Sequence, residues 1–395
     1  MKKMFALSLT LFLLYCCSCA QATELTILGP EAFWEVGFSQ AHPELKLNHS
    51  ASEATGQAYL TLLMTSEDYD VFSLPVGPVY MSLLEKGYLL PLSGTVENHA
   101  FADSLQVGFQ DVLVKDGALY GAPIPSEESL VECVSLGVWT WNQAAWEEEG
   151  LGELPATYEE LLEQMIYWEL RHDVLKQHCE DSPYRLIEAD LGAGGFSAAM
   201  FQAYVLQYET ADGTIDFDTP VFREAMTLLK TYGEMYQPLD ARQALIVPYG
   251  GYMTEMGDNV WISPPAFEPG QTAPIPANLQ VYAINARTQH PQEAEAYVQA
   301  AIQALNEPSL LILTTQAPQE IRSGKQVVLT QAQAQRVQKL SEQAQVNTRS
   351  QFLAGDHYYD MEAMIQQYLH GTLPLDQLIY QLNQRAQMAA DENER

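Results

Sequence analysis

Apolar and polar positions along the first hundred residues predict strands separated by helices. Residues 24–28, 45–47 and 70–72 are short runs typical of strands, and the segments between them carry apolar residues at helical spacing. Strand, helix, strand, helix is typical of a mostly parallel sheet that is covered by helices on both faces. In such sheets ligands bind beyond the carboxyl ends of the strands, so Ser73, which follows residues 70–72, is a candidate ligand contact.

Helical spacing dominates the rest of the chain. Thr157 and Glu160 have the spacing of a capping box, at the start of a helix that extends to about residue 177. Further helices are expected from Pro220 onward and over residues 292–305, 331–345, 361–369 and 375–388. Asp116-Gly117 joins two apolar runs and predicts a two-residue hairpin turn, because both turn positions need positive φ.

Three motifs follow one another between residues 70 and 123. They are Asp70-Val71-Phe72, then Glu85-Lys86-Gly87 with Leu89-Leu90-Pro91-Leu92, and then the hairpin Asp116-Gly117-Ala118-Leu119-Tyr120-Gly121-Ala122-Pro123. In this order they resemble the extracellular solute-binding proteins of ABC importers, family 1, the group that captures sugars and oligosaccharides. The resemblance continues towards the C-terminus at Trp141-Asn142 and at residues 155–161, 217–220, 283–285 and 290–294.

This resemblance implies a two-lobed periplasmic-binding-protein-like type II fold with a hinge between the lobes. A mature chain of about 370 residues is also longer than a single hydrophobic core usually supports. By analogy with the family, we expect an N-terminal lobe of residues 23–130 and about 270–325. The C-terminal lobe would comprise residues 131–269 and about 326–395. The chain is expected to cross between the lobes near residues 125–134 and 261–276.

The N-terminus predicts export. Residues 1–22 combine a basic start, an apolar core and the small-residue cleavage pattern Ala20-Gln21-Ala22, as in a secretory signal peptide. Cys19 stands where a lipoprotein would be lipidated, although Cys16 occupies the position of the usual leucine. We expect the mature protein at the cell surface on a lipid anchor, or free in the periplasm or outside the cell. Cys133 and Cys179 are the other cysteines of the mature chain, and they are either paired or single.

Charge limits the partners of the protein. The chain has 19 Lys and Arg against 51 Asp and Glu, a net charge of −32, which disfavours nucleic acid and anionic lipid. The same surplus either attracts a cationic solute such as a polyamine or serves solubility. The polar clusters at residues 172–180 and 356–362 lack the spacing of a metal site, and the glycines at 192–195 do not complete a nucleotide-binding loop. We therefore expect neither a metal nor a cofactor.

A sugar site needs flat aromatic faces and a few polar side chains for the hydroxyl groups. The aromatic candidates come from both expected lobes, and packing in a core is the alternative for each of them. Trp139 and Trp141 flank Thr140 and are expected to face opposite sides of a strand, with Trp141 free for the cleft. The candidate ligand contacts are Trp34, Glu53, Ser73, Tyr120, Trp141, Phe196, Tyr249, Tyr252, Asp258 and Trp261.

The resulting hypothesis is a binding protein rather than an enzyme. It would capture a small solute, in the first place a carbohydrate, between two lobes and deliver it to an ABC permease, with the lipid on Cys19 as its only membrane contact. Two alternatives stay open: a ligand sensor that feeds a receptor kinase, and a binder of a polyamine-type cationic solute. A secreted hydrolase is disfavoured because no G-x-S-x-G motif or other nucleophile arrangement is recognisable.

Overall fold

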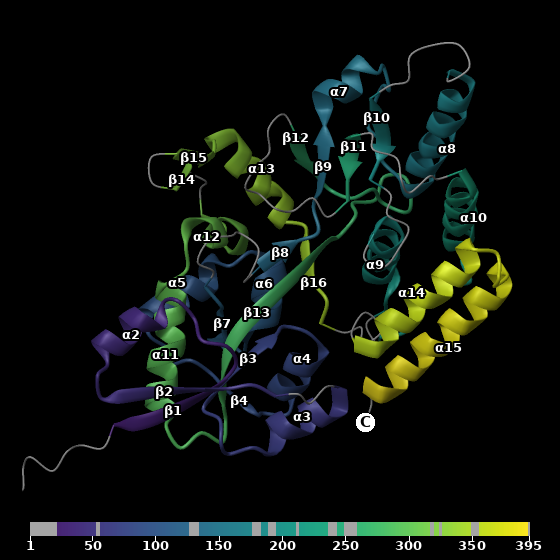
Figure 1. Cartoon of the computed structure of the whole chain (residues 1–395). Coiled ribbons are helices and arrows are strands. Elements are labelled where there is room, and N and C mark those ends of the chain that lie inside the picture. The colour runs from purple at the N-terminus through teal and green to yellow at the C-terminus, as the bar shows by residue number, and fades with distance from the viewer. Residues whose placement is uncertain are drawn as a thin grey trace, which may run out of the picture.

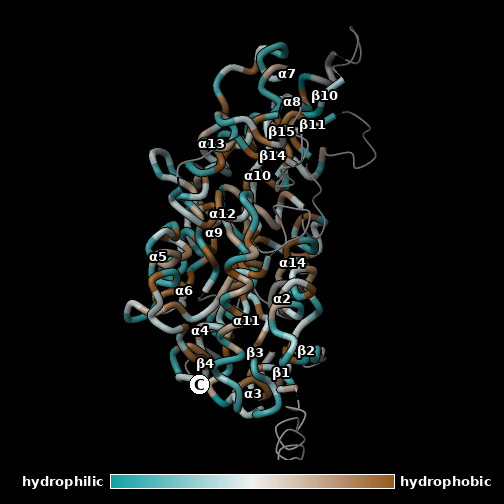
Figure 2. The backbone as a smooth tube through the Cα atoms, turned by 90° about the vertical axis from the view of Figure 1, so that its left-hand side faces the viewer, coloured by the Kyte–Doolittle hydropathy of each residue, from teal (hydrophilic) through white to brown (hydrophobic). Residues whose placement is uncertain are grey.

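The computed structural model describes residues 22–52, 56–125, 134–175, 183–188, 195–210, 213–235, 243–248, 259–316, 320–323, 326–348 and 355–393 of the 395-residue chain. Residues 1–21 of the predicted signal peptide, including Cys19, lie outside these ranges, as do Cys133 and Cys179. The molecule is elongated and has two lobes, each built on a sheet of its own (Figures 1 and 2). The predicted two-lobed α/β architecture is therefore confirmed.

The first lobe contains an eight-stranded sheet. Its main path has the order β16-β13-β3-β1-β2, in which β1, β2 and β3 are parallel and β13 is antiparallel to β3. The short strands β4, β7 and β8 also pair with β13. The bounds are β1 (Thr23–Leu28), β2 (Leu45–Ser50), β3 (Val71–Pro75), β4 (Leu89–Leu90), β7 (Ala122–Pro123), β8 (Val134–Leu136), β13 (Ile275–Asn285) and β16 (Ala344–Val346).

Helices surround this sheet, as the alternating pattern predicts (Figure 1). They are α2 (Glu35–Ala41), α3 (Gly56–Thr65), α4 (Pro78–Glu85), α5 (Val96–Ser104), α6 (Val107–Leu113), α11 (Pro291–Gln303) and α12 (Glu307–Leu313), and a further helix, α13 (Gln331–Ser341), packs against α12. A small ribbon, β14 (Ile321–Ser323) with β15 (Gln326–Leu329), precedes α13.

Local backbone signals in the first lobe behave as predicted. The hairpin between β5 (Val114–Lys115) and β6 (Ala118–Leu119) has positive φ at both turn positions, 53° at Asp116 and 77° at Gly117. Gly87, with φ of 75°, follows the end of α4. Glycine suits positive φ because it has no Cβ to clash with the backbone, and aspartate tolerates it because its short polar side chain can hydrogen-bond locally.

The second lobe contains a four-stranded sheet in the order β10-β11-β9-β12. β10 and β11 are parallel, whereas β9 is antiparallel to both β11 and β12. The strands are β9 (Trp139–Asn142), β10 (Tyr184–Ile187), β11 (Gln243–Val247) and β12 (Asn259–Ile262). The helices are α7 (Gln143–Glu148), α8 (Tyr158–Leu175), α9 (Phe196–Tyr208), α10 (Pro220–Met235), α14 (Gly355–Leu369) and α15 (Leu375–Asn393).

The predicted capping box precedes α8. The backbone N–H of Glu160 donates to the Thr157 hydroxyl at 3.2 Å, and the Glu160 carboxylate accepts from the N–H of Thr157 at 3.3 Å. The helix expected over residues 331–345 is shorter, because α13 ends at Ser341. Residues 344–346 instead form β16, which pairs with β13 in parallel. Pairing with a neighbouring strand thus overrides local helix propensity here.

Each lobe has a hydrophobic core of its own. The first core includes strands β1 to β3 and β13 together with Val337 of α13 and Val346 of β16. The second core combines α8, α9 and α10 with α14 and α15. α13 and β16 therefore pack in the first core, although the expected boundaries assigned residues 326–395 to the C-terminal lobe. The cause is the β13–β16 pairing, which joins this segment to the first sheet.

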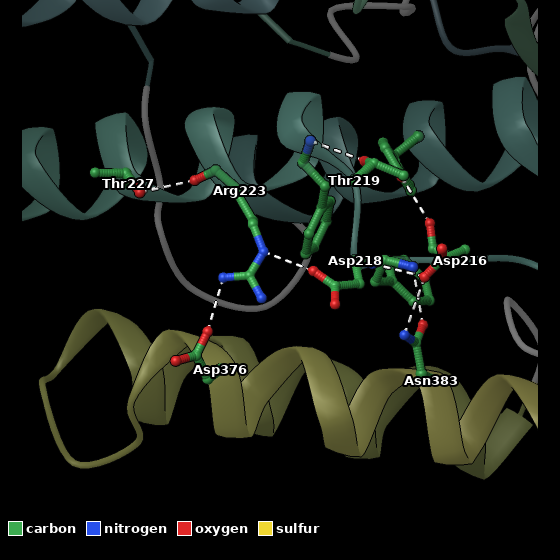
Figure 3. A network of polar contacts seen from close by, with 10 residues as sticks. Asp216, Asp218, Thr219, Arg223, Thr227, Asp376 and Asn383 are labelled. Atoms are coloured by element: carbon green, nitrogen blue, oxygen red, sulfur yellow. Dashed lines mark hydrogen bonds and ion pairs between the residues drawn. The ribbon is translucent and has the colours of Figure 1, made fainter.

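A polar network attaches α15 to the rest of the second lobe (Figure 3). Arg223 of α10 contacts Asp218 at 2.6 Å and Asp376 of α15 at 2.7 Å. The Asn383 side chain accepts from the N–H of Phe217 at 2.8 Å and donates to the Asp216 carboxylate at 3.1 Å.

Among the described helices, none is both long enough and apolar enough to cross a bilayer.

Candidate ligand-binding site

A hollow of about 520 Å³ lies at the carboxyl ends of the three parallel strands of the first lobe. Residues at or just after the ends of β1 and β2, Ser73 in the middle of β3 and Tyr59 of α3 form its walls. The lining residues are Leu28, Gly29, Pro30, His49, Ser50, Ala51, Ser52, Tyr59 and Ser73. Its position follows the rule for ligand sites in open α/β sheets. Ser73, a contact predicted from the sequence, lies in its wall.

Gly29 allows the end of β1 to lie close to Ser73 of β3. A Cβ atom added to Gly29 would stand 2.4 Å from the Cβ of Ser73, a separation that real Cβ atoms essentially never show. The N–H of Gly29 also donates to the carbonyl of Ser50 at 2.9 Å, which links the same position to β2. The wall of the hollow between β1 and β3 therefore depends on the absence of a side chain at residue 29.

His49 borders the hollow and contacts a buried carboxylate. Its Nε2 lies 2.8 Å from Oε2 of Glu35, and its Nδ1 lies 3.2 Å from the carbonyl oxygen of Gly29. The hydroxyl of Tyr297, in α11, donates to Oε1 of Glu35 at 2.6 Å. His49 also lines a neighbouring hollow of about 500 Å³ between α2 and β2. The sequence analysis missed this group, because the strand predicted over residues 45–47 extends through His49 to Ser50 in the structure.

An aromatic cluster backs this network. The ring of Trp34 lies 4.8 Å from that of Tyr297 and 6.0 Å from that of Tyr282, between centroids. Burial raises the pKa of Tyr282 to about 12, and the negative charge of Glu35 acts in the same direction. Burial, with Tyr282 and Glu35 nearby, raises the pKa of Tyr297 further. Both phenols therefore stay protonated at neutral pH.

A larger hollow of about 810 Å³ lies between the two lobes. α4 and α6 of the first lobe, the end of α9 of the second lobe and the connecting residues 272–274 and 342–348 line it. Four carboxylates are among its lining residues: Glu85, Asp111, Glu209 and Glu342. None of the contacts predicted from the sequence is among the described residues that line it.

Three predicted contacts are core residues. Trp34 packs in the first core with an exposed fraction of 8%, and Trp261 is 1% exposed in the same core. Phe196 is fully buried in the second core, where its ring contacts those of Trp139 and Tyr158. The structure thus assigns these side chains the packing role, and none of them lines the first-lobe hollow.

The expectation that Trp139 and Trp141 face opposite sides of a strand is wrong. Residues two apart in a strand point to the same face. In β9 both side chains accordingly lie on the side of the second core: Trp139 is 1% exposed, and Trp141 packs half-buried against Trp146. Trp261 pairs in register with Thr140, so its side chain points to the other face of the sheet.

The remaining predicted contacts divide into two groups. Tyr120 is half-buried and packs against the first core. Glu53, Tyr249, Tyr252 and Asp258 lie outside the described residues. Among the residues that the structure describes, no group of three or more His, Cys, Asp or Glu side chains is placed to hold a metal ion. The described part of the site therefore consists of Ser73 with polar and aromatic neighbours that the sequence analysis did not select.

The chain is similar to proteins of known structure, whereas comparison of its sequence finds no match. No protein-family model matches the chain, and no curated protein matches it. A sugar-binding protein from Xanthomonas citri has a TM-score of 0.61 at 14% identity, and the match covers 94% of this chain and 98% of that one. The galacto-N-biose-/lacto-N-biose I-binding protein of an ABC transporter from Bifidobacterium longum has a TM-score of 0.59 at 12% identity, covering 95% and 98%.

A sugar transporter from Rhizobium etli, in an open conformation, is similar to the same degree. Its TM-score is 0.59 at 13% identity, and the match covers 93% of this chain and 99% of that one. The chain has the two-lobed periplasmic-binding-protein-like fold. At such low identities the similarity lies in the fold, so the ligand has to be argued from the hollows and their lining residues.

Proposed function

We propose that this protein is an extracellular solute-binding protein that captures a carbohydrate between its lobes and delivers it to an ABC importer. The observation that carries the proposal is the similarity in fold over nearly the whole chain to sugar-binding proteins of known structure. One of these was solved with lacto-N-biose, and a similar solute-binding protein of an ABC transporter from Agrobacterium radiobacter was solved with ribitol. Both are uncharged compounds rich in hydroxyl groups.

The chemistry of the first-lobe hollow supports a neutral solute. Ser50 and Ser73 supply hydroxyl groups, and Tyr59 supplies a half-buried aromatic ring. Hydroxyl groups that donate and accept, beside an aromatic face, suit the polar edge and the apolar face of a sugar ring. Among the described lining residues there is no carboxylate, which favours a carbohydrate over a polyamine at this position.

Two lobes that enclose a ligand provide the mechanism of capture. Contacts to both lobes exist only when the lobes are closed, so a bound solute shifts the population towards the closed form. The segments that connect the lobes would act as the hinge. We propose that a permease recognises this closed form, that the predicted signal peptide directs export, and that a lipid on Cys19 tethers the protein to the outer face of the membrane. The proposed role is binding, without catalysis.

The direct test is a binding screen of the mature chain from Thr23. Isothermal titration calorimetry and thermal shift would be measured with monosaccharides, oligosaccharides and sugar alcohols, and with spermidine as the cationic probe. A saccharide present at a hundred times its Kd should stabilise the protein by about 2.7 kcal/mol and raise its Tm by a few degrees. Stabilisation by spermidine alone would refute the carbohydrate assignment and favour the acidic hollow between the lobes.

A matched pair of variants locates the site. Tyr59→Ala should weaken saccharide binding about tenfold, because a stacking aromatic ring is lost. Tyr167→Ala is the control, since Tyr167 is 63% exposed on α8 of the second lobe and lies in neither hollow. Equal affinities of the two variants would show that the saccharide does not bind at the carboxyl ends of β1 to β3.

A further inference from the structure

The backbone and the side chain of Trp261 belong to different lobes. The backbone lies in β12, where Trp261 pairs with Thr140 of β9 in the sheet of the second lobe. The side chain is buried in the core of the first lobe, which also contains Val337 and Leu340 of α13. Its indole Nε1 has no hydrogen-bond partner among the described residues, so packing holds the ring in place. Trp261 therefore links the two lobes through burial of one side chain.

Two hydrogen bonds attach the end of β12 to the first lobe. Nε of Arg336, in α13, donates to the carbonyl oxygen of Trp261. The hydroxyl of Ser263 donates to Oε1 of Gln343, between α13 and β16, at 3.1 Å. Because α13 and β16 pack in the first core, both bonds join the second-lobe strand to the first lobe.

The neighbouring strand β9 enters the second lobe at the same place. Val138 is buried in the first core, and the next residue, Trp139, is buried in the second core. β9 and β12 then pair in register from Trp139 with Ile262 to Asn142 with Asn259. Two paired strands thus leave the first lobe side by side, and close packing around them leaves little room for sliding.

Free space lies elsewhere between the lobes. The hollow of about 810 Å³ has walls from both lobes and from the connecting residues 272–274 and 342–348, and Trp261 is not among its lining residues. A rotation of the lobes about Trp261 can therefore change the width of this hollow while both cores stay intact. The packed contact at Trp261 and the hollow beside it are the arrangement expected of a pivot.

We propose that Trp261, held by Arg336, is a positioning residue for solute capture and forms the pivot that fixes the second lobe relative to the first-lobe hollow. The inference rests on the proposed function, since it takes closure of the lobes over that hollow as the way in which the solute is bound. A fixed pivot limits the positions that the lobes sample without solute, so less conformational entropy is lost on closure. Loss of the pivot should therefore broaden the distribution of distances between the lobes and weaken solute binding.

The first test measures the distance between the lobes and needs no solute. Single-molecule fluorescence energy transfer would be recorded on the mature chain from Thr23, in which Cys133→Ser and Cys179→Ser remove the native thiols. The dyes would be attached at Val96→Cys in α5 of the first lobe and at Tyr167→Cys in α8 of the second lobe. Both positions are exposed, so the dyes should not disturb either core.

Two variants and two matched controls decide the result. Trp261→Ala and Arg336→Met should broaden the distance distribution. Lys339→Met is the control for Arg336→Met, because Lys339 is exposed on the same helix, and Trp146→Ala is the control for Trp261→Ala, because Trp146 is buried in the second core. A wild-type width in Trp261→Ala, or equal broadening in Trp146→Ala, would overturn the proposal. Circular dichroism would show that each variant is folded, and if Trp261→Ala is not, a wild-type width in Arg336→Met would overturn it.

A second measurement connects the pivot with the solute. Calorimetry with maltotriose, lacto-N-biose and ribitol would give the Kd of each variant for the probe that wild type binds. We expect Trp261→Ala to bind it about tenfold more weakly, and Trp261→Phe, which keeps an aromatic ring in the core, to recover most of this loss. Unchanged affinity in Trp261→Ala would overturn the role in capture. Binding of none of the probes or other saccharides by wild type would instead refute the carbohydrate function, and the distance measurement would still decide whether Trp261 is the pivot.

Discussion

Asp70, in the loop that leads into β3, accepts a hydrogen bond from the backbone N–H of Thr26 in β1 at 2.8 Å. Its other carboxylate oxygen accepts from the hydroxyl of Thr288, and its own carbonyl accepts from the N–H of Asn285 at 3.0 Å. Asp70 therefore joins β1, β3 and the end of β13. Asp70, the first residue of the Asp70-Val71-Phe72 motif, stabilises the contacts between these strands. It lines neither the first-lobe hollow nor the hollow between the lobes.

Replacement of Asp70 should destabilise the first lobe. The side chain is 5% exposed, and Asp70→Ala removes two hydrogen bonds to a charged acceptor, so we expect a loss of about 2–3 kcal/mol in the free energy of unfolding. Urea denaturation would measure it. Asp68→Ala is the control, since Asp68 is exposed in the same loop. Equal stabilities of the two variants would contradict the structural role of Asp70.

A side chain at residue 29 should disturb the binding hollow. Gly29→Ala places a Cβ against Ser73 and should cost about 1–3 kcal/mol through overpacking. The double variant Gly29→Ala with Ser73→Gly should recover most of this loss, because it removes the opposing side chain. Gly37→Ala is the matched control, because nothing lies within 4 Å of a Cβ at Gly37. It should stabilise α2 by about 0.5–1 kcal/mol. No recovery in the double variant would show that the strain does not arise at Ser73.

The contacts of Arg223 should be sensitive to salt. Arg223 contacts both Asp218 and Asp376, and hydrogen bonds to these carboxylates raise its pKa. The guanidinium group is solvent-exposed, so Arg223→Gln should lower Tm slightly at low ionic strength and make little difference in 1 M salt. Thermal unfolding at both salt concentrations measures this. An equal loss in 1 M salt would mean that packing of the arginine stem, rather than charge, attaches α15.

Alkaline pH should weaken the protein through its buried tyrosines. Burial raises the pKa of Tyr282 and of Tyr204 to about 12 from about 10 in the unfolded chain. Each buried neutral phenol therefore contributes to the free energy of unfolding of the protein. This contribution is fully present below pH 10 and is lost as the pH rises towards 12, up to about 2–3 kcal/mol for each residue. Denaturant titrations at pH 9 and pH 11.5 would show the loss. Tyr282→Phe should reduce it, whereas Tyr380→Phe, at a 61% exposed position, should not.

Much of the local structure was predictable because it depends on neighbours in sequence. The turn at Asp116-Gly117, the capping box of Thr157 and Glu160 and the start of α10 at Pro220 each need only the residues within them. The strand through residues 71 and 72 was likewise recognisable, although β3 continues through Ser73 to Pro75 rather than ending before Ser73. By contrast, the segment 344–346 carries no local signal for a strand, because its pairing partner in β13 is about seventy residues away.

The sequence by itself determined the α/β class, the order of the elements and, through its motifs, the two-lobed fold. It could not decide which aromatic residues face a hollow, because Trp34, Phe196 and Trp261 differ from exposed aromatics only in what packs against them. The tertiary structure decided this. It also brought Glu35, His49 and Tyr297, which are far apart in the chain, within hydrogen-bonding distance. Burial and such long-range contacts depend on how the sheets and helices pack, and the residue pattern within one element does not contain that information.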